Sequence, residues 1–330
     1  MTPVVRIPWR LWILRNRSCC TIEPLYIPRN VQTRVYLCLQ AWTAPEVVPG
    51  TRESSFSTQN PVLFHDARNS TLWLFATRQP STKKASAYTN DPVPSQETKG
   101  QLWAMSTPTG VDNKWQWSPP FVLDGSNGTW GRNPPLVRLD GSWLLPMYNE
   151  SLKSMGHNYE HSMLFLKPLD ALLLPFTAGD QGPPVGWREV DMTASSYLVQ
   201  PSLVRLQPGQ PALRAFFRDR RAAFIYTSTS PDDGLTWTTP VATSLPNNNA
   251  GIHASRLRNG SLLLVFNLMH GETKDDLRNI LAAAVSDDGG ETFGPPRLLE
   301  RHHSSAEGVG GLGPTSCNCY SYPTSVQVFN

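Results

Sequence analysis

Two copies of one eight-residue pattern restrict the fold of this chain more than any other feature. The copies read SPDDGLTW at residues 230–237 and SDDGGETF at residues 286–293, 56 residues apart. In each copy an Asp, Asp232 or Asp288, can accept backbone N–H bonds inside a turn, and the Gly two positions later can adopt a positive φ. The closing aromatic residue would then bury and fix the turn. We therefore predict a β-hairpin turn at each copy rather than a reactive site.

A second motif recurs along the chain and opens apolar runs. Its occurrences are Asn60-Pro61, Asn133-Pro134, Gln200-Pro201, Ile252-His253 and Tyr322-Pro323. Segments that begin at Trp42 and Trp117 resemble the ends of the eight-residue pattern and close two earlier units. One unit is thus strand, turn, strand, turn and strand, which is about the size of a four-stranded propeller blade. The period predicts an all-β propeller in one domain.

Composition agrees with an all-β chain and excludes two classes of partner. The 30 Pro and 23 Gly punctuate the sequence, and 11 Trp can anchor the blades. The net charge is only +3 and the signs are interspersed, so no basic stripe exists for nucleic acid. No apolar run is long enough to span a membrane. We expect a monomer.

The cellular compartment stays open. Five Cys residues are an odd number at low density, which does not favour a disulfide framework. Asn-x-Ser/Thr triplets at Asn16, Asn69, Asn127, Asn149 and Asn259 permit glycosylation if the chain is secreted. The N-terminal apolar run from Leu11 to Leu14 is too short for the core of a signal peptide.

The repeated turns resemble the Asp-boxes of sialidases and of the wider sialidase-like, BNR-repeat glycosidase family. The resemblance covers about residues 31–330 and leaves residues 1–30 as an atypical N-terminal segment. It implies a six-bladed β-propeller of the sialidase type, incomplete at its first and last blades, with no cofactor and no metal. The sequence stops within the first strand of its last blade. Either the ring closes unusually or the sequence is a truncated gene product.

The resemblance also implies a site made by Arg218, Arg278 and Tyr322, which match the family by motif context. Planar guanidinium groups from different blades can bind the carboxylate of a sialic acid. A Tyr nucleophile suits this substrate because it does not repel the carboxylate. Equivalent blade positions predict that the three side chains converge on the propeller axis. Tyr320 is an alternative nucleophile.

The sequence departs from the family at two places. Gln200 occupies the position of the Glu that pairs with the Tyr, and an amide cannot take a proton; His253 and Glu272 are nearby candidates for the base. Arg6-Ile7-Pro8 matches the start of the family, but the strand and the general-acid Asp that should follow are missing. Arg6 is therefore only a candidate for a third arginine.

Two motifs are set aside. His157 and His161 fit an HxxEH zinc pattern, but the blade pattern puts them on or beside a strand without a placed third ligand. The GxGxxG match at residues 308–313 lacks the flanking strand and helix of a nucleotide site, and we interpret it as a flexible loop.

Three functions remain in competition. The leading hypothesis is a glycoside hydrolase that removes a terminal acidic sugar from a glycoconjugate. The first alternative, favoured by Gln200 and the absent Asp, is a catalytically inactive carbohydrate-binding propeller. The second alternative is a uronic-acid lyase, in which Tyr322 would be the base and His253 would neutralise the substrate carboxylate.

Overall fold

The regular elements of the protein are β-strands throughout the part described here. The computed structural model describes residues 10–11, 46–47, 56–80, 100–109, 115–124, 128–150, 160–167, 187–192, 194–270, 278–301, 322–325 and 327. The chain divides into two units, Met1–Ser54 and Ser55–Asn330. In the first unit, β1 (Arg10–Leu11) pairs antiparallel with β2 (Glu46–Val47). The boundary predicted between residues 30 and 31 lies outside the described residues.

The second unit contains four antiparallel sheets, each formed from consecutive strands. The first blade has β3 (Phe56–Asp66), β4 (Thr71–Pro80), β5 (Gln101–Pro108) and β6 (Phe121–Asp124). The second has β7 (Thr129–Gly131), β8 (Leu136–Val137), β9 (Trp143–Asn149), β10 (His161–Lys167) and β11 (Arg188–Asp191). The third has β12 (Leu198–Arg205), β13 (Leu213–Asp219), β14 (Phe224–Ser230) and β15 (Val241–Pro246). The fourth has β16 (His253–Arg256), β17 (Leu262–Asn267), β18 (Ile280–Ser286) and β19 (Arg297–Arg301).

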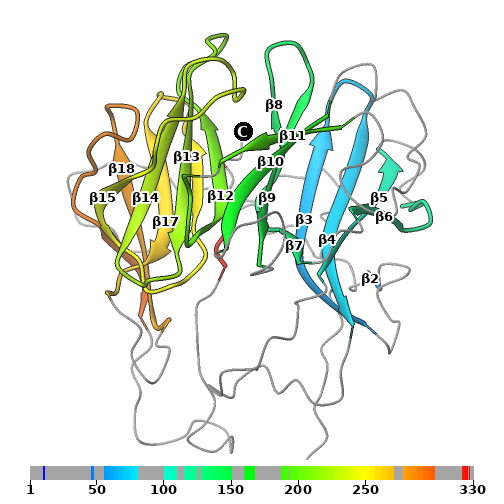
Figure 1. Cartoon of the computed structure of the whole chain (residues 1–330), viewed down its shortest axis with the longest axis horizontal. Coiled ribbons are helices and arrows are strands. Elements are labelled where there is room, and N and C mark those ends of the chain that lie inside the picture. Colours follow the sequence, from blue (N-terminus) through cyan, green and yellow to red (C-terminus); the bar gives the residue numbers. More distant parts are fainter. Residues whose placement is uncertain are drawn as a thin grey trace, which may run out of the picture. The chain divides into compact units, whose positions relative to one another are not determined.

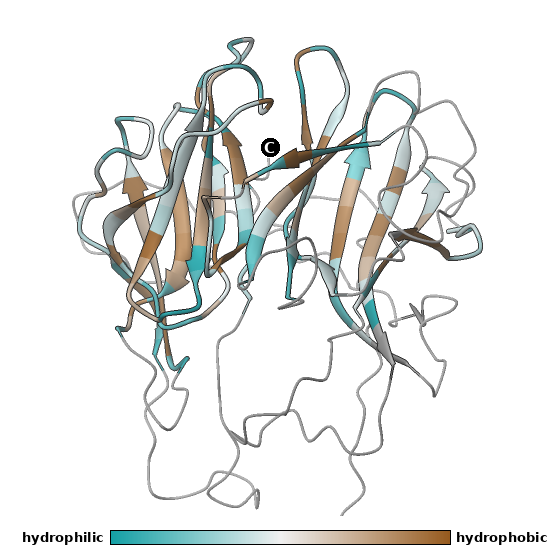
Figure 2. Ribbon diagram, in the orientation of Figure 1, coloured by the Kyte–Doolittle hydropathy of each residue, from teal (hydrophilic) through white to brown (hydrophobic). Residues whose placement is uncertain are grey.

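These sheets are successive blades of a propeller-like arrangement (Figure 1). The first strands of the blades lie innermost, since β12 contacts both β9 and β16 of the adjacent blades. Hydrophobic residues concentrate in the strands and hydrophilic residues in the connecting turns (Figure 2). The prediction of an all-β propeller-like fold is confirmed. Four blades are described, and the number six stays a prediction.

The inner strands of three blades break at the repeated residue-Pro motif. The pairing of β3 with β4 shifts register between Gln59 and Val62, and that of β12 with β13 shifts between Val199 and Ser202. In the second blade the break is wider, because β7 and β8 are two separate strands that both pair with β9. Each break contains a motif proline, which cannot donate to the ladder. The motif therefore marks the same structural position in all three blades.

Both copies of the eight-residue pattern are hairpin turns, as predicted. Asp232 accepts the backbone N–H groups of Leu235 and Thr236 at 3.1 and 2.8 Å. Asp288 accepts the N–H of Thr292 at 3.0 Å in the same way. The glycines have φ of +90° and +92° at positions 234 and 290. The carboxylate therefore stabilises the turn from inside.

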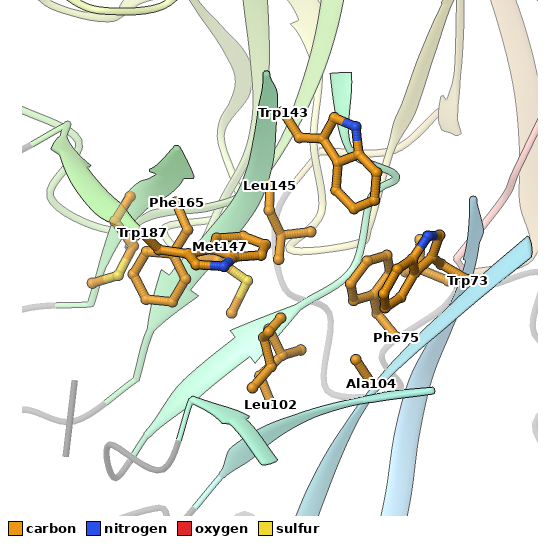
Figure 3. Packing of buried hydrophobic residues seen from close by; sticks show 12 residues of the cluster. Trp73, Phe75, Leu102, Ala104, Trp143, Leu145, Met147, Phe165 and Trp187 are labelled. Atoms are coloured by element: carbon orange, nitrogen blue, oxygen red, sulfur yellow. The ribbon is translucent and has the colours of Figure 1, made fainter. Parts of the chain in front are cut away.

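Aromatic residues fill the core between the first two blades. Trp73 and Phe75 come from β4, Trp143 from β9 and Phe165 from β10, and Trp187 directly precedes β11 (Figure 3). The rings of Trp73 and Trp143 meet edge to face, with centroids 5.6 Å apart. Such pairs add to the area that the rings bury. Two predominantly aliphatic clusters, with Phe216, Phe217 and Phe266 among them, combine residues of the second and third blades and of the third and fourth blades.

Within the described ranges, no helix is long and apolar enough to cross a membrane.

Candidate functional site

Three arginines surround the ring of Tyr322. The Cζ atoms of Arg132, Arg218 and Arg278 lie 5.3, 6.0 and 5.5 Å from the centroid of this ring. Tyr322 belongs to the segment 322–325, which is drawn in red in Figure 1. Its exposed fraction is 40%, whereas Arg132 and Arg218 are buried. Three cations therefore face one ionisable side chain that solvent can reach.

Arg218 makes the direct contact with the phenol. It lies near the end of β13, where it pairs in register with Val199, the residue before the break in β12. Its Nη1 donates a hydrogen bond to the Tyr322 hydroxyl oxygen at 3.2 Å, and its Nε donates to Asn249 Oδ1 at 2.9 Å. Burial, together with the charge of Arg220, lowers the pKa of Arg218. The guanidinium is therefore held in a fixed orientation in a partly desolvated place.

Asn249 accepts hydrogen bonds from both Arg218 and Arg278 and holds the two side chains together. Arg278 lies just before β18, and its Nη2 donates to the backbone oxygen of Asn249 at 3.1 Å. Asn249 adopts the left-handed conformation, with φ of 57°, which Asn tolerates better than most residues. Its side chain thus accepts from one arginine while its backbone accepts from the other. The two arginines and Tyr322 that sequence reasoning assigned to one site do lie together.

Arg132 is the member of the site that sequence reasoning missed. It follows β7, in the break before β8, and is 6% exposed. Its Nη2 donates to the backbone oxygen of Pro323 at 2.7 Å, and its Nη1 donates to Asn133 Oδ1 at 2.8 Å. Burial lowers its pKa to about 10. Its position directly before the Asn133-Pro134 motif is the signal that could have found it.

The surrounding charges make Tyr322 unusually acidic. Burial on its own would raise the pKa of this phenol, but the charges of Arg218 and Arg278 and the hydrogen bond from Arg218 outweigh burial and lower the pKa to about 8. An ordinary Tyr has a pKa of about 10. A phenolate at Tyr322 is therefore accessible near neutral pH without a carboxylate base beside it.

Gln200 lies next to this centre and is almost fully buried. Its Nε2 donates to the Tyr148 hydroxyl at 3.3 Å, and burial raises the pKa of Tyr148. Gln200 has a φ of 56°, close to the 57° of Tyr322 and the 51° of Asn60. All three precede a proline, for which the left-handed conformation is disfavoured. These residues therefore share one strained backbone geometry, which is typical of functional positions.

Gly251 lets these groups approach one another. A Cβ atom at this position would lie 2.7 Å from Tyr322 Cδ1, 3.0 Å from Arg132 Nε and 3.1 Å from Gln200 Oε1. The first of these distances is impossible without a shift of the ring. Gly is therefore required here for close packing under Tyr322.

A cluster of ion pairs adjoins Arg218. Arg220 Nη2 pairs with Glu150, which follows β9, and Arg220 Nε lies 2.5 Å from Oε2 of Glu160, which precedes β10. Burial and the charge of Glu150 raise the pKa of Glu160, against the attraction of Arg220. The cluster joins the second and third blades beside the arginine site.

His253 is buried at the start of β16 and faces the same segment as Arg132. Its Nδ1 accepts the backbone N–H of Ser325 at 3.2 Å and lies 2.9 Å from the Ser325 hydroxyl. Burial and the charge of Arg132 lower its pKa to about 4. The imidazole is therefore neutral at physiological pH, with its proton on Nε2. A neutral ring does not supply the positive charge that the lyase alternative requires.

The other sequence candidates fall outside the described residues: Arg6, His157, Glu272, Tyr320 and the 308–313 loop. His161 starts β10 and is buried. Among the described residues, no group of three His, Cys, Asp or Glu side chains could hold a metal ion.

Comparison with known proteins identifies the family. Over residues 31–330 the sequence matches the BNR repeat-like domain. The chain belongs to the BNR repeat-like family. This confirms the resemblance inferred from the two turn motifs. Among curated proteins, no sequence match to this BNR protein was found.

Solved structures similar to the BNR protein include two sialidases. A Hadza microbial sialidase has 19% identity and a TM-score of 0.58, and covers 80% of the BNR protein. A protein of unknown function from Dyadobacter fermentans has 16% identity and a TM-score of 0.54, and the match covers 79% of the BNR protein. A mutant of the NanB sialidase from Streptococcus pneumoniae has 11% identity and a TM-score of 0.51, and the match covers 78% of the BNR protein. The match covers 50%, 70% and 54% of those chains, so the BNR protein spans about half the length of the two sialidases. At these identities the likeness shows the fold alone.

Proposed function

We propose that this BNR propeller is a glycoside hydrolase that removes a terminal acidic sugar, as sialidases do. Arg218 and Arg278 would bind the carboxylate of the sugar. Tyr322 would attack the anomeric carbon or stabilise positive charge there. Guanidinium groups bind carboxylates in a planar, bidentate geometry, so two of them from different blades would fix both position and orientation.

The contact between Arg218 and Tyr322 carries this proposal. A guanidinium nitrogen lies 3.2 Å from a phenol oxygen whose pKa is about 8, and the ring is 40% exposed. A cation that contacts both the nucleophile and the substrate carboxylate brings them together and supports the anionic form of the nucleophile. An arginine that served only as a surface ion pair would need no ionisable aromatic partner.

Gln200 changes how the nucleophile would be activated. An amide cannot accept the phenol proton, so the arginines must favour the phenolate directly. In the covalent step, the Tyr322 oxygen would form a bond to the anomeric carbon while the bond to the leaving oxygen breaks. Water would then cleave the glycosyl–tyrosine bond and release the sugar with net retention. Activity is therefore expected to rise with pH as the phenolate forms, to reach half of its maximum near pH 8 and to level off at higher pH.

Three finer points belong to the same proposal. We propose that Arg6 is the third carboxylate-binding arginine and that residues 1–30 form a separate N-terminal segment. We also propose that the complete propeller has six blades. The placement of residues 322–325 beside β16 supports an inner strand after the fourth blade, because Ser325 bonds to His253 and Gln327 Oε1 accepts the N–H of Arg258. An experimental structure of the full chain tests the number of blades, and an Arg6→Met variant tests whether affinity for the sugar falls.

Turnover of a fluorogenic aryl sialoside tests the function itself. The wild-type protein should release the fluorophore, and Tyr322→Phe, which lacks only the hydroxyl, should lose at least about 100-fold of this rate. Thermal melting of both proteins checks that the variant folds. Release no faster than from Tyr322→Phe would rule out the hydrolase.

A carbohydrate-binding propeller without catalysis is the second candidate, and buried Gln200 is the observation that favours it. Its signature is binding without turnover. Isothermal titration with free sialic acid should then show a complex that Arg218→Met abolishes and Tyr322→Phe keeps. Binding lost equally in both variants would contradict this alternative.

A further inference from the structure

The backbone at Tyr322 needs support from elsewhere in the molecule. Its φ of 57° is left-handed, and the proline that follows makes this conformation more costly. Residues held in such regions of φ and ψ persist only where their surroundings fix them. The segment 322–325 must therefore be held by contacts with other blades.

Arg132 provides one such contact at the residue after Tyr322. Its Nη2 donates to the Pro323 carbonyl oxygen at 2.7 Å, and its Cζ lies 5.3 Å from the Tyr322 ring centroid. Its Nη1 is used at the same time by Asn133 Oδ1 at 2.8 Å. The rigid fork of a guanidinium can make both bonds at once, which a lysine cannot reproduce.

Asn133 carries the connection on to the third blade. Its Nδ2 donates to the backbone oxygens of Gln200 and Pro201, both at 3.0 Å, and the residue is 1% exposed. Hydrogen bonds in such a buried place are costly to break, because the groups left behind cannot reach water. The breaks at Pro134 and Pro201 and the segment that contains Pro323 are thus joined by two adjacent side chains.

The hydrogen bonds of Arg132 and Asn133 lead to the contact between Arg218 and Tyr322, on which the proposed function depends. Arg218 pairs with Val199, directly before the break in β12, and Asn133 binds the backbone inside that break. Tyr322 is held to the same break through Arg132 and Pro323. The break in β12 therefore helps to position both Arg218, the donor of this hydrogen bond, and Tyr322, its acceptor.

We propose that Arg132 and Asn133 are positioning residues that hold Tyr322 against Arg218 and Arg278 by joining the proline-containing breaks of the second and third blades to the segment 322–325. Neither residue needs to contact the sugar. The inference rests on the proposed function for its catalytic meaning, but it concerns the geometry of Tyr322 and can be tested without turnover.

Ionisation of Tyr322 is the readout, because it reports the distance to the cations. The charged and titratable groups that act on this ring or are acted on by it are Arg132, Arg218, Arg220, Arg278 and Tyr148. NMR of isotope-labelled tyrosines gives the titration of each ring, and Tyr322→Phe identifies the resonance of Tyr322. The wild-type resonance should titrate near pH 8.

Asn133→Ala is the decisive variant, since it removes no charge. If the network positions the ring, the pKa of Tyr322 should rise by about 1 in this variant as the ring moves away from Arg218. Arg132→Lys should raise it as well, because the charge stays but the fork is lost. Ser202→Ala is the matched control: it removes another bond between blades, that from the Ala254 N–H at 2.9 Å, without touching the network. It should leave the titration of Tyr322 unchanged.

The outcomes separate positioning from charge. If Tyr322 titrates in both Asn133→Ala and Arg132→Lys as it does in the wild type, the two residues do not position the ring and the proposal is wrong. If Asn133→Ala does not fold, Arg132→Lys decides by itself. A shift in these variants together with no hydrolysis by the wild type would keep the positioning inference and reject the hydrolase.

Discussion

Two regions of this BNR propeller place cations against aromatic rings, and they differ in what the rings can do. Between the first two blades, Nζ of Lys167 lies 5.5, 5.0 and 5.5 Å from the ring centroids of Trp73, Trp143 and Trp187. Around Tyr322 the arrangement is reversed, with three cations about one ring. Lys167 is 0% exposed and Tyr322 is 40% exposed.

The difference shows how a buried charge becomes a site. In the tryptophan cluster no ring can ionise, so the environment acts on the cation: burial lowers the pKa of Lys167 to about 7. In the arginine cluster the guanidinium groups keep their charge, so the environment acts on the ring and lowers the pKa of Tyr322 to about 8. A cation–π arrangement alone is therefore a packing feature. Reactivity requires a ring that can ionise and that a ligand can reach.

The largest effect is expected at Arg218. Replacement by Met removes the direct donor to Tyr322 and one carboxylate-binding group, so kcat/KM for an acidic sugar should fall by about 100- to 1,000-fold. The pKa of Tyr322 should rise toward 10 in the same variant. Steady-state kinetics over pH measures both. Lys167→Met is the control from the tryptophan cluster, and an equal loss of activity there would remove the distinction between the two regions.

Site residues could be predicted from the sequence only where they belong to a repeated motif. The residue-Pro motif predicted equivalent positions in successive blades; Gln200 lies on β12, and Tyr322 lies beside the arginines without being part of a described strand. Arg132 escaped because it lies directly before the motif, whereas Arg218 lies on the second strand of its blade, so the two arginines do not occupy equivalent positions in the repeat. The number of blades could not be derived either, since closure of a ring depends on contacts between segments that carry no repeat. Packing distances at Gly251 depend on three residues far apart in sequence, which no local pattern records.

Acid should destabilise the folded protein through His253, which contacts Ser325 in the segment of Tyr322. His253 has a pKa of about 4 in the folded protein and about 6.5 in an unfolded chain. Above pH 6.5 both states are neutral and the group has no effect on stability. As the pH falls from 6.5 to 4, the unfolded chain binds a proton that the folded chain does not, so stability falls by about 3 kcal/mol. Below pH 4 there is no further loss.

Chemical denaturation at a series of pH values checks this expectation. In His253→Gln, the free energy of unfolding should not show the decrease between pH 6.5 and pH 4 that His253 causes in the wild type. The same pH dependence in wild type and variant would show that protonation of this ring does not cause the loss of stability.

A smaller effect is expected from Gly251→Ala. The new Cβ would lie 2.7 Å from Tyr322 Cδ1, and the half-exposed ring can relieve this contact by moving outward. The hydrogen bond from Arg218 would lengthen, and kcat/KM should fall by about 10-fold, or about 1.4 kcal/mol. Gly294→Ala, whose Cβ would meet only Val285 O at an ordinary 3.6 Å, is the matched control. Equal kinetics of the two alanine variants would contradict the requirement for glycine under the ring.

The smallest effect should come from Lys167→Met, and it should appear in stability alone. The pKa of Lys167 is about 7 in the folded protein and 10.5 ordinarily, so folding costs free energy below pH 10.5, where the unfolded chain holds the proton more tightly. Methionine fills a similar volume without this cost but also loses the attraction of three tryptophan rings. We therefore expect stability at pH 7 to rise by only about 1 kcal/mol, and more at pH 7 than at pH 10.5, with sialoside turnover unchanged. Thermal melting at the two pH values measures the change. A variant less stable at pH 7 than the wild type would mean that the tryptophans stabilise the ammonium group more than burial destabilises it, and the two regions would then be alike in holding their cations charged.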